Sequence, residues 1–168
     1  MTVPIQVQFV QQTSRNTCVH ACLSMVTGLP IEGLVGRFGD KGLSFDEEAV
    51  VLTELGILPV PKAGLASDLF PEQGVYLVTV PSLNFPGLNH RVVWMSDPGS
   101  GNFILLDPNE GRTDFEAYPR HCIHQNDGPL KGYSEVTLLR VMRGHRGHQR
   151  REELYKQRCA AVQVTACS

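Results

Sequence analysis

The sequence predicts an α+β domain, with helices in its first third and antiparallel strands after them. Helix-like apolar segments with recognisable caps come first, and β-rich runs separated by Pro- and Gly-rich turns follow. The chain has 168 residues, of which 42% are hydrophobic and 19% charged. This is an ordinary globular balance that can bury a core. It excludes a mostly disordered, collagen-like or coiled-coil chain.

The first part of the chain indicates one strand and three helices. Residues 3–10 alternate apolar and polar side chains, which predicts a short strand. A mostly apolar helix over 18–27 begins after Thr13, Ser14, Asn16 and Thr17 and is stopped by Gly28 and Pro30. A short helix is expected over 31–38. A third begins at Ser44, where Glu47 completes a capping box, and runs to about residue 55.

The second half of the chain indicates an antiparallel sheet. Strand-like runs are found at 75–80, 91–96, 102–106 and 133–142. The sequence DPGSG at 97–101 predicts a hairpin turn between the second and third of these runs. We therefore expect the helices to pack on one sheet.

The charge is unevenly distributed along the chain. The net charge is −2, which argues against a dedicated nucleic-acid binder. Residues 143–158 hold six basic and two acidic residues, for a charge of +4. The rest of the chain, with nine basic and fifteen acidic residues, carries −6. We predict a domain over 1–143 and a basic C-terminal tail over 144–168, either a solvated helix or a surface for an acidic partner.

Cysteine usage and the termini favour a reduced, cytoplasmic protein without a membrane partner. Five cysteines leave at least one thiol unpaired in the monomer, and no CxxC occurs. The N-terminus lacks the features of a signal peptide, and no apolar stretch is long enough to span a membrane. The sequence HCIH at 121–124 lacks a matching second pair of ligands, so we expect neither a metal nor another cofactor.

Cys18 is the first candidate for chemistry. It stands at the predicted start of a helix, where free amides and the helix dipole favour the reactive thiolate. Gln12 lies six residues earlier, where its amide and the Cys18 N–H could form an oxyanion hole. Taken alone, each residue also fits an ordinary structural role, Cys18 as a buried thiol and Gln12 as a surface side chain.

His90 and Asp107 flank the predicted hairpin at equal distances from its turn. We expect them to be cross-strand partners, with side chains on one face and within hydrogen-bonding distance. An imidazole held by a carboxylate is the base-and-orienter part of a catalytic triad. Separately, a turn Asp before a Pro and a loop His would be unremarkable, and their coincidence around one turn favours chemistry.

With these residues in this order, the chain resembles papain-like cysteine peptidases, in particular the C39-like branch related to bacteriocin-leader peptidase domains. The resemblance covers about residues 4–115. It is carried by CVHACLSMVTG, LPIEGLVGRFGDKGLSFDEEAVVLTELGI and YLVTVPSLNFPGLNHRVVWMSD…FILLDPNEG. It implies a papain-like fold, with the N-terminal helices packed on an antiparallel sheet, and a protein or peptide substrate.

By the same resemblance, Cys18 is the nucleophile, His90 its base, Asp107 the residue that orients the imidazole, and Gln12 an oxyanion-hole donor. Val19 departs from the family, which often has Gly after the nucleophile. Two other functions stay open at this point. The same machinery could deamidate glutamine or transfer an acyl group, and a non-catalytic binding or effector module could act through the basic tail.

Two residues near Cys18, His20 and Cys22, are also chemically reactive types and need an interpretation. His20 lies two positions later, on a different helix face, and is expected at the rim of the cleft or on the surface. Cys22 lies one turn after Cys18 and is expected in the core.

Overall fold

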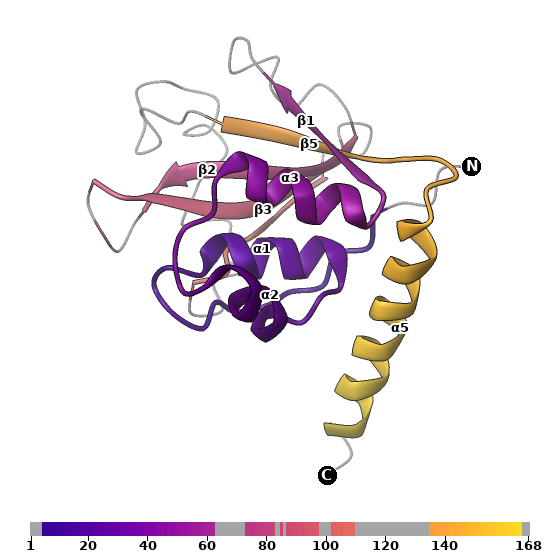
Figure 1. Cartoon of the computed structure of the whole chain (residues 1–168). Coiled ribbons are helices and arrows are strands. Elements are labelled where there is room, and N and C mark those ends of the chain that lie inside the picture. The colour runs from indigo at the N-terminus through magenta and orange to yellow at the C-terminus, as the bar shows by residue number, and fades with distance from the viewer. Residues whose placement is uncertain are drawn as a thin grey trace.

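The computed structural model describes residues 5–62, 73–82, 85, 87–97, 102–109 and 135–165, and it confirms the predicted α+β class (Figure 1). In the described part of the chain the helices are α1 (Cys18–Thr27), α2 (Ile31–Phe38), α3 (Phe45–Glu54) and α5 (Gly147–Thr165). The strands are β1 (Ile57–Lys62), β2 (Gly74–Pro81), β3 (Asn89–Asp97), β4 (Asn102–Leu106) and β5 (Glu135–Val141).

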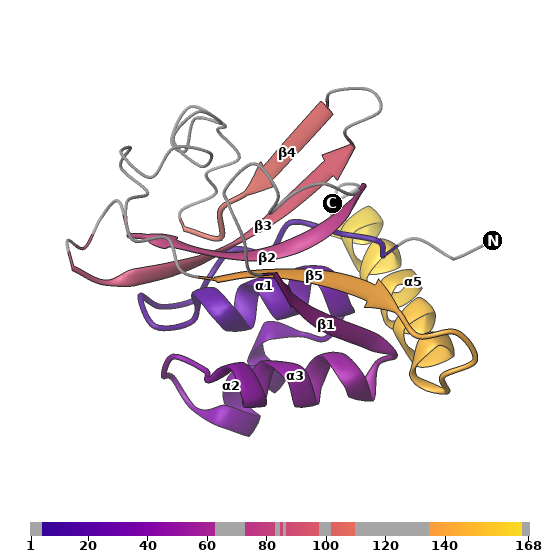
Figure 2. The same ribbon diagram turned by 90° about the horizontal axis from the view of Figure 1, so that it is seen from above.

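The five strands form one antiparallel sheet in the order β1-β5-β2-β3-β4. Figure 2 shows α1, α2 and α3 on one face of this sheet and α5 beside its end. The pairing of β3 with β4 is the antiparallel pair predicted from the turn between them, although residues 98–101 themselves lie outside the described residues.

The core lies between α1 and the sheet. All ten residues of α1 are buried. Leu23 and Val26 of this helix belong to one apolar cluster with Leu77 of β2 and Val93 of β3. An apolar helix that is buried all round must be central to the domain, because no polar face is left for solvent.

The helix ends follow the local signals in the sequence. Gly28 caps α1 in the left-handed conformation, with φ of 81°, and its amide donates to the carbonyl of Ser24. The Ser44 side chain accepts from the amide of Glu47, and the Glu47 side chain accepts from the amide of Ser44, which completes the predicted capping box.

The predicted strand over 3–10 is wrong for residues 5–10, which the structure describes and which form no regular element. Their main-chain groups form hydrogen bonds with α1 and α5 instead of with a neighbouring strand. The Gln8 amide donates to the carbonyl of Met25 at 3.3 Å, and the Tyr155 hydroxyl lies against the carbonyls of Gln6 and Met25. The alternating pattern reflects apolar side chains that pack on the core from an extended segment.

β1 is not among the predicted strands, and it contains two prolines, Pro59 and Pro61. It lies at the edge of the sheet, paired only with β5, with Pro59 opposite Leu139 and Pro61 opposite Thr137. An edge strand tolerates proline, because its outward positions need no amide for the ladder.

The basic segment after residue 143 contains α5, and one side of this helix packs on the domain. The Tyr155 side chain is 3% exposed. The Arg158 guanidinium donates to the carbonyls of Ser24 and Leu29 at 2.9 and 2.7 Å, and Arg151 donates to the carbonyl of Leu55 at 3.2 Å. Division of the chain at residue 143 stays a prediction.

Within the described residues, no helix is long and apolar enough to cross a membrane.

Candidate functional site

Cys18 is the first residue of α1, as predicted, and its side chain sits at the surface of the core with 9% exposed. The N-cap residue Thr17 makes no side-chain cap hydrogen bond, because its hydroxyl accepts from the amides of Thr13 and Ser14. The Thr17 side chain therefore leaves the first amides of α1 uncapped, and the amide of Val19 is one of the groups that lower the pKa of Cys18. Such a helix start favours negative charge on the sulfur.

His90 and Asp107 are joined by a hydrogen bond. The distance from His90 Nε2 to Asp107 Oδ1 is 2.7 Å, and the two side chains are 8% and 2% exposed. Asp107 Oδ1 also accepts from the amide of Asn109 at 2.8 Å, which fixes the carboxylate. With Nε2 occupied, the other ring nitrogen of His90 is left for the Cys18 thiol.

The register differs from the expected one. β3 and β4 pair Val93 with Leu106, so one further step places Asp107 opposite Val92, two positions from His90. The prediction of a directly opposite pair is therefore wrong by two residues. A shift of two keeps both side chains on the same face, and a diagonal pair is still within reach of a long side chain such as histidine.

Cys18 and His90 lie close enough for each to change the ionisation of the other. Burial opposes the thiolate, but the hydrogen bond and charge of His90, with the amides of Arg91 and Val19, outweigh it and lower the pKa of Cys18. Burial also opposes the imidazolium, but hydrogen bonds to Asp107 and Cys18 raise the pKa of His90 to about 9. Both directions favour a thiolate–imidazolium pair near neutral pH.

Cys22, one turn further along α1, provides an internal contrast. Its side chain is fully buried, as expected for a core residue, and Sγ donates to the carbonyl of Arg91 at 3.2 Å. Burial raises the pKa of this thiol well above its usual range. The helix α1 therefore carries two thiols with opposite pKa shifts: that of Cys18 is lowered, and that of Cys22 is raised.

Gln12 is connected to the site through its main chain. Its amide donates to the carbonyl of Pro108, the residue after Asp107, at 2.9 Å. Its side-chain Nε2 donates to the carbonyl of Ser14 at 2.9 Å, within its own turn. The structure thus places Gln12 beside the segment that carries Asp107, with one of its two side-chain N–H groups occupied.

The prediction that His20 lies at the cleft rim or on the surface is wrong, because its side chain is fully buried. The helix face that carries it is covered by the turn after α2, and the charges nearest to its ring include Asp40 and Glu47. Burial lowers the pKa of His20 despite those carboxylates, so the ring is neutral at neutral pH.

Sequence reasoning missed a buried ion pair beside His90. Arg91 Nη2 lies 2.7 Å from Glu48 Oε2 of α3, with side chains 3% and 7% exposed. The signal was available, because Arg91 directly precedes the apolar run VVWM at 92–95, and a buried charge requires a partner.

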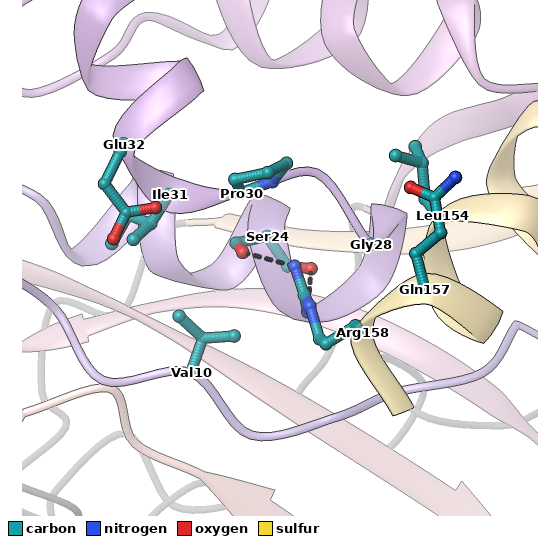
Figure 3. Close-up of a pocket in the computed structure, with 9 residues that line it drawn as sticks. All are labelled: Val10, Ser24, Gly28, Pro30, Ile31, Glu32, Leu154, Gln157 and Arg158. Atoms are coloured by element: carbon teal, nitrogen blue, oxygen red, sulfur yellow. Dashed lines mark hydrogen bonds between the residues drawn. The ribbon is translucent and has the colours of Figure 1, made fainter. Parts of the chain in front are cut away.

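A pocket of about 330 Å³ lies at the opposite end of α1 from Cys18 (Figure 3). Its lining comes from the N-terminal segment, the end of α1, the start of α2, and α5. Within it Arg158 donates to the carbonyl and hydroxyl oxygens of Ser24, as the dashed lines show. None of Cys18, His90, Asp107 and Gln12 lines this pocket, so it is separate from the site.

Across the described ranges, no group of three or more His, Cys, Asp or Glu side chains is arranged to hold a metal ion. The HCIH sequence at 121–124 lies outside those ranges.

No protein-family model matches the chain, and no curated protein is similar to it in sequence. Among solved structures, it is similar to the crystal structure of a double glycine motif protease from an AMS/PCAT transporter in complex with the leader peptide. The TM-score is 0.55 at 16% identity, and the alignment covers 83% of this chain and 94% of that one. This likeness establishes the α+β papain-like fold of C39 peptidase domains.

Proposed function

We propose that the chain is a cysteine peptidase that acts by thiol acyl transfer on an amide bond. The observation that carries the proposal is the buried 2.7 Å hydrogen bond between His90 and Asp107, with the imidazole lowering the pKa of Cys18 at the start of a buried helix. The fold shared with a C39 protease supports it, and so do the opposite pKa directions of Cys18 and His90.

In the proposed first half-reaction, the Cys18 thiolate attacks the carbonyl carbon of the scissile peptide bond. The resulting tetrahedral oxyanion collapses as the His90 imidazolium gives its proton to the leaving amine and the C–N bond breaks. A thioester on Cys18 and a free amine result. His90 then takes a proton from water, which attacks the thioester and releases the acid and the thiolate.

The proposed oxyanion hole consists of the Cys18 amide and the Gln12 side chain. Gln12 has a second side-chain N–H besides the one bonded to Ser14. Its main-chain bond to Pro108 ties it to the segment that carries Asp107. Two donors at a developing oxyanion stabilise the transition state in a site from which water is largely excluded.

Asp107 has an indirect role in this scheme. Its hydrogen bond holds the imidazole with one nitrogen toward Cys18 and stabilises the positive charge on the ring. We propose a peptide as the substrate, because the similar protease was solved with a leader peptide.

The test is digestion of a peptide panel, including leader peptides with a double glycine, in ¹⁸O-labelled water and with mass-spectrometric readout. The intact chain should create new carboxyl termini that carry the label, and Cys18→Ala should not. Cys159→Ala is the matched control, since this thiol is exposed and lies on α5. Conversion of glutamine to glutamate without new termini would instead indicate a deamidase, and unchanged cleavage by Cys18→Ala would rule out the mechanism.

A further inference from the structure

The ion pair next to His90 joins three elements of the fold. The Arg91 guanidinium of β3 contacts the Glu48 carboxylate of α3 at 2.7 Å. Its other terminal nitrogen donates to the hydroxyl of Thr79 in β2, which is also the cross-strand partner of Arg91. The side chain of Arg91 therefore ties β3 both to the helix layer and to the neighbouring strand.

The main chain of the same residue faces α1. The Arg91 carbonyl accepts from Cys22 Sγ at 3.2 Å, and the Arg91 amide is one of the groups that lower the pKa of Cys18. Cys18 and Cys22 are one helical turn apart, on the same side of α1. The hydrogen bond to Cys22 therefore holds this side of α1, with Cys18, against β3.

Stability alone does not account for a charge pair at this place. Taking two charges out of water offsets most of their attraction, and apolar side chains of similar size often serve as well. In addition, the pair fixes the position of the main chain at Arg91, because the guanidinium is bonded to both Glu48 and Thr79.

We propose that the Arg91–Glu48 ion pair is a positioning device for Cys18, holding the β3 main chain so that the Arg91 amide points at the reactive sulfur. The inference deepens the proposed function and rests on Cys18 being the nucleophile. Arg91 and Glu48 are positioning residues, since their charged groups act through the main chain at Arg91.

Loss of the pair should weaken the bond from the Arg91 amide to the sulfur and make the thiolate harder to form. The other groups that face Cys18 stay in place: His90 beside it, Asp107 beyond the imidazole, and Cys22 one turn along α1. A change in Cys18 ionisation after removal of the pair would therefore report the position of the main chain at Arg91.

The experiment follows alkylation of Cys18 by iodoacetamide as a function of pH, in the full chain with Cys122, Cys159 and Cys167 replaced by Ser. The test variant is the double substitution Arg91→Met with Glu48→Leu, which removes both charges and keeps bulk. We expect it to fold, and we expect alkylation at mildly acidic pH to slow about tenfold, equal to a rise of about one in the Cys18 pKa.

Two further variants complete the design. Glu48→Gln keeps the shape of the pair and removes one charge, so it decides the matter if the double variant does not fold. Glu54→Gln is the matched control, since it breaks the exposed pair with Arg37, also 2.7 Å long. A folded double variant with the unmodified pH profile overturns the inference. An ordinary Cys18 pKa in the unmodified chain would count against the proposed function as well.

Discussion

The imidazole of His90 and the carboxylate of Asp107 meet through Nε2 and Oδ1 at 2.7 Å, in a place where both side chains are almost fully buried. This bond decides which ring nitrogen faces the thiol and adds to the stability of the imidazolium. The ionisation of Cys18 therefore depends indirectly on Asp107, which follows β4, whereas His90 is on β3.

Asp107→Asn should uncouple the two ionisations. Asparagine keeps an oxygen for the Asn109 amide but removes the charge that supports the imidazolium, so the pKa of His90 should fall from about 9 toward its usual range. Peptide cleavage should drop on the order of 100-fold, with the alkaline limb of the pH profile moved to lower pH. An unchanged alkaline limb would show that Asp107 does not set this pKa.

His90→Gln should raise the pKa of Cys18 above its usual range instead of below it. Burial raises the pKa of this thiol and His90 lowers it, so without the imidazole the thiolate should form only at alkaline pH. The measurement is the pH dependence of iodoacetamide alkylation, with peptide mapping to locate the modified cysteine. Cys22 serves as the internal control, since it is fully buried and should stay unmodified in both proteins.

The pH profile expected for peptide cleavage by the unmodified chain follows from the same two pKa shifts. The acid limb should lie below the usual range of a thiol, because the pKa of Cys18 is lowered. The alkaline limb should lie near pH 9, where His90 loses the proton that the leaving amine requires. A profile that rises steadily through pH 9 would contradict the ion-pair starting state.

Gly147→Ala should destabilise the chain by about 1–3 kcal/mol, because a side chain there is forced against backbone. An added Cβ would lie 2.3 Å from the carbonyl oxygen of Glu54 and 2.6 Å from the Cα of Leu55. Gly36→Ala in α2 is the matched control, since nothing lies within 4 Å of its Cβ position. It should be neutral or stabilise by about 0.5–1 kcal/mol through helix propensity. Urea denaturation of both variants measures the difference.

Arg158→Gln should cost about 2 kcal/mol, because its guanidinium donates to three oxygens of Ser24 and Leu29. Arg150→Gln on the same helix is the control, since that side chain is exposed. Equal urea midpoints for the two variants would mean that docking of α5 adds little to stability.

The elements that could be predicted from sequence are those specified locally. Gly28 and the Ser44–Glu47 capping box define helix ends without reference to the rest of the chain. The antiparallel pairing of β3 with β4 could also be predicted from the sequence. Its register could not, because a shift of two residues preserves the apolar pattern on each face.

The features that sequence reasoning missed depend on distant segments. β1 is a strand only because β5 pairs with it, and residues 5–10 are irregular because α1 and α5 provide their hydrogen-bond partners. His20 is buried because the turn after α2 covers it. The partner of Arg91 is Glu48, which lies 43 positions earlier in the chain. No pattern within a short window carries that information.

The docking of α5 has a consequence for how the protein is made. The carboxyl end of α1 is held by Arg158, 134 positions later in the chain, and by Tyr155, 130 positions after Met25. A ribosome therefore has to add 134 residues after Ser24 before Arg158 can bond to the end of α1. Contacts of such long range form late, because a large loop must close first. During synthesis the residues of α1 are therefore made long before the α5 side chains that bond to its carboxyl end.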